Sequence, residues 1–394
     1  MAVRSAATRP KTAFATAPTA HSLAGFDGLR AIAALLIICH HTGFVSGTTF
    51  RTRWGYYFTR MDIGVPVFFA ISAFLLTRPF AAALLDDQPL PDRYKFWVRR
   101  LARIYPAYIV AAIVILIGHG IDVRGGSGLF FSLSLTHIYH PGRFISGITQ
   151  SWSLATELSF YLLLPLWAMF MRRWLAGRGV NRRALVLLGS IALLFASSFV
   201  FRLGFHAVLP TRWFQITRYW LPSLIDLFAP GMALAVLSVW GQRRSFVADA
   251  TQIGQYAVAC WAGALVLFWF VSTQLGLERG LVVSSFSREM FRQTIYAVVG
   301  LLLVAPVALR GRRPSRILDV LDLPPVAGFG MVSYGVYLWH QYVLREVGSV
   351  MGWPLFSGHF WGLLLPTVAI SALVGWVSWR VIERPALALT SGWR

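Results

Sequence analysis

Charged side chains are scarce in this chain. Only 13% of its 394 residues are charged, whereas 57% are hydrophobic and the mean hydropathy is +0.62. A soluble protein carries roughly 25% charged residues. This composition excludes a soluble globular fold for most of the chain, and apolar runs that recur from end to end indicate a membrane protein.

Cysteine is nearly absent as well. Cys39 and Cys260 both lie inside apolar runs, which argues against a disulfide framework and a structural zinc site. The sequence shows no metal-ligand spacing and no internal repeat, so we expect no metal cofactor. Residues 1–24 contain no apolar core long enough for a cleaved signal peptide, and we interpret them as a flexible cytoplasmic tail.

Negative charge is the scarcer sign, with 15 Asp and Glu against 36 Lys and Arg and a net charge of +21. Such an excess can indicate nucleic-acid binding. Here the basic residues lie mostly in short loops between apolar segments, as the positive-inside rule predicts, so we expect no nucleic-acid partner. The many alanines and arginines and few lysines suggest a high-GC bacterium, and we predict a multi-pass protein of the bacterial inner (plasma) membrane.

The hydropathy pattern predicts an all-α polytopic membrane protein with about ten transmembrane helices. An apolar piece at 128–139 is about a dozen residues long and too short to cross. If it crossed, the arginine-rich loop 172–183 would lie outside the membrane. The positive-inside rule places such loops in the cytoplasm, so it favours a topology in which both termini are cytoplasmic. In that topology 128–139 is an interfacial or re-entrant segment on the outer side. The predicted spans are 28–47, 63–84, 101–119, 152–171, 183–202, 218–239, 253–273, 292–309, 326–347 and 361–381. We divide the chain into the tail 1–24, one transmembrane domain 25–385 and a cytoplasmic end 386–394.

The first span, RAIAALLIICHH, carries titratable residues at both ends. Arg30 and His41 are eleven residues apart, about three helical turns and roughly 16 Å, so they share a face, while His40 is rotated by about 100°. Intramembrane ionisable residues usually have a function. We therefore predict that His41 is the functional histidine; the alternative is a structural histidine bonded to a neighbouring helix.

The third span begins with WVRRLARIYPAY. Arg100 and Arg103 are neighbours on one helical face, and with Arg30 they would form a cytoplasmic cluster suited to phosphate. The alternative is ordinary positive-inside flanking, which fits Arg99 well. Arg103 is followed only by apolar residues and Tyr105, so it fits that alternative poorly.

Two acids lie within predicted spans. Glu157 is about a turn and a half into the fourth span, with Tyr161 on the next turn of the same face. A buried carboxylate needs a partner, so Glu157 is a candidate catalytic residue, with a salt bridge between helices as the alternative. For Asp226, in the sixth span, we favour a structural role.

The remaining histidines are ambiguous from sequence. His340, on one face with Tyr334 and Tyr337, is either a second site residue or a packing histidine; His137 and His140 are weak candidates for an outer acceptor site.

The overall layout places phosphate-suited charge inside, a titratable base midway and a carboxylate nearer the outside. It fits a transferase whose activated donor and acceptor approach from opposite sides.

The same segments resemble acyltransferase family 3, integral membrane acyltransferases of ten or so spans that modify sugars, glycolipids and some antibiotics. FDGLRAIAALLIICHHTGF resembles the family's first helix, whose arginine and histidine are separated by ten residues, as are Arg30 and His41. VFFAISAFLLTRPF resembles the second helix, with Ala73 where a glycine is usual. RRLARIYPAY resembles the paired-arginine motif and WSLATELSFYLLLPL the helix bearing the glutamate. SYGVYLWHQYV and SWRVIERPAL resemble the last two helices.

The resemblance implies an acyl-CoA donor, most simply acetyl-CoA, on the cytoplasmic side. It implies an acceptor hydroxyl on an envelope sugar or glycolipid, for example a mycolyl-trehalose type lipid, at the outer face. By residue, Arg30, Arg100 and Arg103 would hold the donor, and His41 would be the base or nucleophile. Glu157 would orient the acceptor or tune His41; possible acceptor or support residues are Asp226, Tyr161 and His340.

Many members of the family carry an extracellular hydrolase-like domain after the last helix, and the present chain resembles the standalone form. A proton-coupled transporter or flippase of an anionic lipid or glycolipid is the strongest alternative, although such proteins often show repeats. An inactive scaffold of an envelope assembly is a second alternative, which the presence of Arg30, His41 and Glu157 disfavours. The expected partners are acyl-CoA, the acceptor and membrane lipids, with envelope-assembly proteins as possible further partners.

Overall fold

The structure is a computed structural model of the whole chain. It describes residues 25–390 except 120–125, 144–146, 209–212, 214–215, 244–252, 281–283 and 311–314. The predicted tail 1–24 and the last four residues of the predicted cytoplasmic end lie outside the described residues.

The described residues form helices and no strand, which confirms the all-α prediction. The α-helices are α1 (Phe26–Ser46), α2 (Thr48–Arg51), α3 (Gly55–Arg60), α4 (Gly64–Leu85), α5 (Arg93–His119), α6 (Gly126–Leu133), α7 (Trp152–Leu175), α8 (Val180–Val208), α10 (Leu221–Arg243), α12 (Ala257–Thr273), α13 (Phe286–Ala308), α14 (Arg316–Asp319), α15 (Pro324–Met331), α16 (Ser333–Val350), α17 (Phe360–Ser378) and α18 (Arg384–Leu389). The 3₁₀ segments η2 (Met61–Ile63), η3 (His137–Tyr139), η4 (Thr149–Ser151), η5 (Ile253–Tyr256) and η6 (Val320–Asp322) and a π-helical turn, η7 (Trp379–Glu383), join some of them.

Nine helical segments in the described part of the chain are long and apolar enough to cross a membrane. They correspond to nine of the ten predicted spans; eight are longer than predicted, and Ile253–Thr273 has the predicted bounds. The nine are Phe26–Ser46, Gly55–Leu85, Arg93–Gly118, Thr149–Leu175, Val180–Val208, Leu221–Arg243, Ile253–Thr273, Phe286–Ala308 and Phe360–Leu389.

The tenth predicted span, 326–347, is not one continuous apolar helix. The chain breaks at Val332 between α15 and α16, and α16 carries Arg345 and Glu346 near its end. Most of α16 is buried among other helices, including the polar Ser333 and His340, whereas Arg345 near its end is exposed. A helix enclosed by protein does not need the uniform apolar surface of a lipid-facing span, and this explains the difference.

The segment 128–139 does not form a span. It contains most of the eight-residue helix α6, three irregular residues (134–136) and the 3₁₀ turn η3. An eight-residue helix is about 12 Å long, less than half the thickness of a bilayer core.

Loop contacts define two ends of the helical bundle. At one end Arg243 pairs with Asp86 (2.5 Å) and Arg183 with Asp87 (2.9 Å), which joins the ends of α4 and α10 to the start of α8. We call this the Asp86 end. At the other end the Phe356 N–H donates to the Val45 carbonyl (2.8 Å), which joins the α16–α17 loop to the end of α1. We call this the Phe356 end. Which end faces the cytoplasm stays a prediction.

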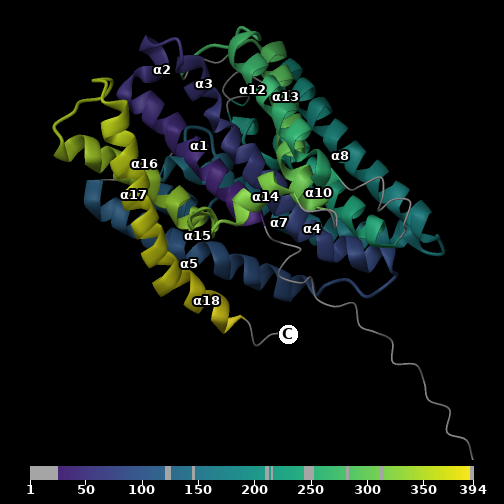
Figure 1. The fold of residues 1–394 in the computed structure, drawn as a ribbon. Coiled ribbons are helices and arrows are strands. Elements are labelled where there is room, and N and C mark those ends of the chain that lie inside the picture. The colour runs from purple at the N-terminus through teal and green to yellow at the C-terminus, as the bar shows by residue number, and fades with distance from the viewer. Residues whose placement is uncertain are drawn as a thin grey trace, which may run out of the picture.

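The first helix lies in the interior of the bundle. Figure 1 shows α1 between α16 and α17 on one side and α12 and α13 on the other. α1 packs against α4, α15, α16 and α17, and eleven of its residues are buried. Arg30 and His41 are therefore both held within protein.

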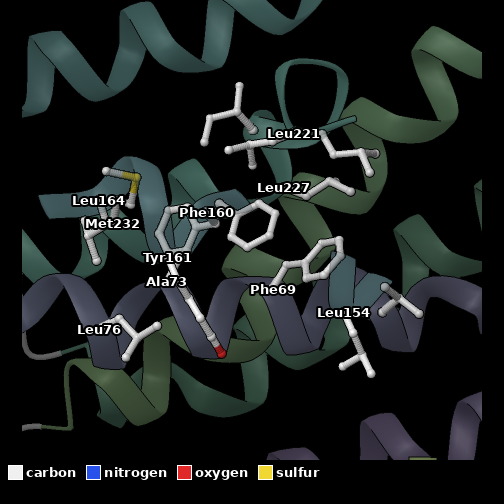
Figure 2. Close-up of a cluster of buried hydrophobic side chains, with 14 of the residues drawn as sticks. Phe69, Ala73, Leu76, Leu154, Phe160, Tyr161, Leu164, Leu221, Leu227 and Met232 are labelled. Atoms are coloured by element: carbon white, nitrogen blue, oxygen red, sulfur yellow. The ribbon is translucent and has the colours of Figure 1, made fainter. Parts of the chain in front are cut away.

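The core centres on α4, α7 and α10. The Phe228 ring stacks on Phe69 (4.3 Å between centroids) and on Phe160 (4.5 Å), so one aromatic column joins the three helices. Figure 2 shows Phe69 and Phe160 within this cluster. α10 approaches α4 closely because Gly231 faces the Ala70 carbonyl, and any side chain there would collide with it. This contact holds α4 close to α10. Residues of α4 line part of the cavity described next.

Candidate functional site

A cavity with about 880 Å³ of empty space, including the part open to solvent, lies among α1, α4, α5, α7 and α16. We call it the first cavity. It brings together five of the residues singled out in the sequence: Arg30, Arg100, Arg103, Glu157 and Tyr161. The other lining residues are Val65, Phe68, Phe69, Ile71, Ser72, Leu75, Leu76, Ile104, Ser153, Leu154, Ser333, Tyr334 and Tyr337.

The three arginines of the first cavity differ in their partners. Arg30 pairs with Asp27 on its own helix (2.6 Å). Arg100 and Arg103 form no ion pair or hydrogen bond with any residue that the structure describes, although both lie within electrostatic range of Arg30. Two unpaired guanidinium groups side by side are a strong site for a phosphate-bearing ligand.

Glu157 lies on the same cavity and is held by two hydroxyls. The Ser72 hydroxyl of α4 donates to its Oε1 in a short hydrogen bond, and the Tyr161 hydroxyl donates to the same oxygen at 2.7 Å. Glu157 forms no salt bridge with a described residue, so the helix-pairing alternative does not apply to it. Two donors on one oxygen fix the carboxylate and leave Oε2 for another group.

Ser72 was missed by the sequence reasoning. Its only signal is that it is a hydroxyl residue in the otherwise apolar run VFFAISAFLL. Because serine is common in transmembrane helices as a small packing residue, that signal does not separate it from its neighbours.

His41 is not part of the lining of the first cavity. Its Nε2 lies 3.0 Å from the amide nitrogen of Gln341, and its ring lies 5.2 Å from that of His340. The His340 ring is 5.7 Å from that of Tyr337, which does line the cavity. Arg30 thus lines the first cavity while His41 contacts α16 beside it.

His40 points elsewhere. Its Nδ1 lies 3.0 Å from the Phe58 carbonyl on α3. Because a carbonyl oxygen only accepts, Nδ1 carries the hydrogen. The His40 ring is therefore anchored to α3. The two adjacent histidines therefore have different surroundings, as the 100° rotation predicted.

His340 is anchored in a similar way. Its Nδ1–H donates to the Tyr337 carbonyl of its own helix (2.8 Å), so its Nε2 is the acceptor nitrogen. That Nε2 is buried and has no hydrogen-bond partner among the described residues. The cluster of His41, His340 and Gln341 combines two imidazoles and one amide beside the cavity.

Asp226 lies away from the first cavity. Its carboxylate accepts from Arg202 of α8 (2.9 Å) and from the Gln293 amide of α13 (2.7 Å). The side chain is fully buried, so these bonds join three helices. This geometry agrees with the structural role that we favoured for Asp226.

His137 is fully buried in η3, a segment outside the candidate spans, and its Nε2 lies 3.3 Å from the Ser151 hydroxyl. Burial lowers the pKa of His137 to about 4. His140, which directly follows η3, is half-buried, with Nδ1 2.8 Å from the Pro141 carbonyl. Neither histidine lines the first cavity.

Comparison with known proteins relates most of this chain to one protein family. A family model described as an acyltransferase domain matches residues 23–380. The chain is 25% identical to Peptidoglycan O-acetyltransferase OatA of Listeria monocytogenes over 91% of its own length and 55% of that protein. It is 26% identical to Nodulation protein 10 of Rhizobium leguminosarum, and 27% identical to Acyltransferase MdmB of Streptomyces mycarofaciens. The matches cover 92% and 94% of this chain, respectively, and 93% of each relative.

The chain therefore spans about half the length of the peptidoglycan O-acetyltransferase but nearly all of the other two relatives. No solved structure matches it significantly.

Proposed function

Because the chain belongs to acyltransferase family 3, whose model matches residues 23–380, we propose that it transfers an acyl group from acyl-CoA to an envelope hydroxyl. The membrane acyltransferase class itself follows from the family and its relatives. The donor is acetyl-CoA in the simplest case and enters from the cytoplasm at the Asp86 end. The acceptor is a sugar or glycolipid at the outer face of the bacterial inner membrane.

The unpaired arginines of the first cavity carry the donor assignment. CoA bears three phosphates, and Arg100 and Arg103 offer charge-assisted donors with no competing ion pair among the described residues. Arg30 of α1 lies within electrostatic range of both and is itself paired with Asp27. In this proposal the first cavity takes the narrow pantetheine arm, with the nucleotide at its mouth.

The chemistry needs a base near the thioester. The acceptor oxygen attacks the thioester carbonyl while His41 removes the hydroxyl proton; the ester C–O bond forms, the C–S bond breaks, and the proton passes to the departing thiolate. Transfer through an acyl-His41 intermediate has the same overall balance, with one further acyl transfer. His340 is the histidine in contact with Tyr337 of the first cavity, and His41 lies beyond it, so in this proposal the acyl end of the donor passes Tyr337 to reach His41.

Glu157 acts on the acceptor side of this arrangement. Ser72 and Tyr161 hold one carboxylate oxygen, which leaves the other to accept a hydrogen bond from the acceptor and orient it. The Listeria relative, Peptidoglycan O-acetyltransferase OatA, supports a glycan acceptor, because its name assigns it peptidoglycan as substrate.

The test uses inside-out membrane vesicles given isotopically labelled acetyl-CoA, with wild type, His41→Ala and His40→Ala compared. Label in extracted lipids or glycans should appear with wild type, persist with His40→Ala and vanish with His41→Ala. His40 is the matched control because it is adjacent but anchored to Phe58.

The transporter alternative predicts another result, because the same arginines would bind an anionic lipid headgroup. No label in any product across several acyl-CoAs, together with no acyl-CoA binding by the purified protein, would replace the transferase proposal with the transporter. Binding without transfer would instead point to an acceptor missing from the vesicles.

A further inference from the structure

A second cavity, with about 1050 Å³ of empty space including its open part, lies among α4, α7, α8, α10 and α13. Its lining comes from the end of α8 and the starts of α4, α7, α10 and α13, so it lies toward the Phe356 end. Its lining residues are Asp62, Val65, Pro66, Trp152, Arg202, Phe205, Thr217, Arg218, Tyr219, Ser223, Leu224, Leu227, Phe286, Glu289, Met290, Arg292, Gln293 and Tyr296. None of its polar residues was predicted as a site residue.

The charges of the second cavity are largely paired within its own wall. Arg292 pairs with Glu289 (2.7 Å) and Asp62 (3.2 Å), and Arg202 pairs with Asp226 just behind the wall (2.9 Å). With the exposed Arg218, the three lining arginines and these three carboxylates balance. The first cavity, by contrast, has two unpaired arginines. A polyanion such as CoA therefore suits the first cavity, and a neutral polar ligand suits the second.

Two polar atoms in the second cavity have no hydrogen-bond partner in the described part of the chain. The Gln293 amide nitrogen donates to Asp226 and to the Ser223 carbonyl, but its Oε1 accepts from no described residue. The Trp152 indole N–H likewise donates to none. Neither atom is fully enclosed, since neither is among the buried atoms lacking a partner. One free acceptor and one free donor thus face the cavity.

An aromatic surface completes the cavity. The centroids of the Trp152 and Tyr219 rings lie 5.0 Å apart, and the two ring planes meet at 51°. The Arg218 guanidinium lies over the Tyr219 ring, 5.0 Å from its centroid. A sugar ring has apolar C–H faces that pack on aromatic rings and hydroxyls around its edge that hydrogen-bond to carboxylates, amides and guanidinium groups. The second cavity offers both kinds of contact.

The two cavities lie back to back. Val65 lines both of them, and along α7 Trp152 lines the second while Ser153 and Leu154 line the first. Phe69 of the first cavity contacts the Trp152 ring (6.4 Å between centroids). One layer of side chains therefore separates a site suited to an anionic donor from a site suited to a neutral polyhydroxyl ligand.

We propose that the second cavity binds a neutral saccharide ring, a part of the acceptor other than the reacting hydroxyl that Glu157 orients in the first cavity, with Trp152 as the stacking surface and Gln293 as a hydrogen-bond acceptor. This inference rests on the proposed function for its role in transfer, but saccharide binding is testable without activity.

The test measures cysteine protection in lipid nanodiscs. In a background of Cys39→Ser and Cys260→Ser, Met290→Cys reports on the second cavity and Leu75→Cys on the first; both positions are partly exposed. Maleimide labelling is timed with desulfo-CoA, which lacks a competing thiol, or with a saccharide. The saccharide probes are maltose, N,N′-diacetylchitobiose and, in the disc, monogalactosyl diacylglycerol.

We expect a saccharide probe to slow labelling of Met290→Cys by about tenfold at about ten times its Kd, because the rate follows the unoccupied fraction. Labelling of Leu75→Cys should respond to desulfo-CoA and not to saccharide. Protection by the free disaccharides indicates a glycan ligand; protection by the galactolipid alone indicates a lipid headgroup.

Trp152→Ala should raise the saccharide concentration needed for protection by about tenfold, and Trp152→Phe by much less, because the phenyl ring keeps a stacking face. Desulfo-CoA protection of Leu75→Cys in the same variants shows that they are folded. If no saccharide protects either cysteine, or if saccharide protects Leu75→Cys, the saccharide site in the second cavity is refuted, while the donor assignment of the first cavity is unaffected. Failure of desulfo-CoA to protect Leu75→Cys in the parent overturns the donor assignment instead.

Discussion

The amide nitrogen of Gln341 lies 3.0 Å from Nε2 of His41 and joins α16 to the candidate base on α1. An amide N–H only donates, so Nε2 accepts and the opposite ring nitrogen, Nδ1, carries the hydrogen. Gln341 is therefore a positioning residue for His41: it holds the ring and its Nδ1–H tautomer in the resting state, and the acceptor hydroxyl takes its place on Nε2 when His41 removes the proton.

Replacing Gln341 with methionine should lower kcat by about ten- to a hundredfold, the usual cost of losing a residue that orients a functional histidine. KM for acyl-CoA should stay within a factor of about two, since the phosphate-binding arginines are untouched. Steady-state kinetics would show this division, with Tyr342→Phe on the same helix as control. A raised KM at unchanged kcat would contradict the positioning role.

Arg103→Gln should raise KM for acyl-CoA by about tenfold or more and make binding less sensitive to salt, because one charge-assisted phosphate contact is lost. Arg103→Lys keeps the charge and should fall in between. Arg99→Gln is the control on the same helix, because Arg99 does not line the first cavity. Equal effects at Arg99 and Arg103 would indicate a general surface charge effect and no specific site.

Tyr161→Phe and Ser72→Ala each remove one hydroxyl from Glu157 and should each lower kcat by about tenfold, the value of one hydrogen bond to a charged group. Tyr334→Phe serves as the matched control. Its hydroxyl lies in the same cavity but donates to the Ile104 carbonyl at 2.8 Å. If all three variants lose activity equally, the loss reflects cavity shape rather than the state of Glu157.

Asp226→Asn should destabilise the protein with little effect on the chemistry of the purified folded enzyme. Breaking a buried ion pair by removing one partner costs about 3–5 kcal/mol, because the other charge stays buried. Thermal unfolding in detergent measures the loss. The double variant Arg202→Met with Asp226→Leu should recover much of it, and a double variant as unstable as the single would refute a purely structural pair.

His137 should make the protein less stable in acid. Its folded pKa of about 4 lies below the usual 6.5, so the unfolded chain binds more protons between these values. Stability should be unaffected above pH 6.5, fall as the pH drops toward 4, and change by at most about 3 kcal/mol. Unfolding midpoints measured across this range would reveal the slope, and His137→Asn should flatten it without altering stability at neutral pH.

The sequence predicted the parts of the site that depend on local spacing. Helical periodicity placed Arg30 and His41 on one face, and it separated His41 from His40. Adjacency on the helix placed Arg100 beside Arg103. These relations lie within one helix, and one helix has fixed geometry.

Relations between helices could not be predicted in the same way. Gln341 lies 300 positions from His41, and Ser72 lies 85 positions from Glu157. No periodicity connects such pairs, and only the packed bundle brings them together. The burial of α16 was missed for the same reason, because a hydropathy profile treats every helix as if it faced lipid.

Val65 forms part of the wall of both cavities, with only 8% of its surface exposed. A ligand that displaces this side chain from one side must change the shape of the space on the other. By thermodynamic reciprocity, donor and acceptor would then alter each other's affinity by the same factor. If both ligands bind as proposed, the volume of Val65 would set whether they assist or oppose one another.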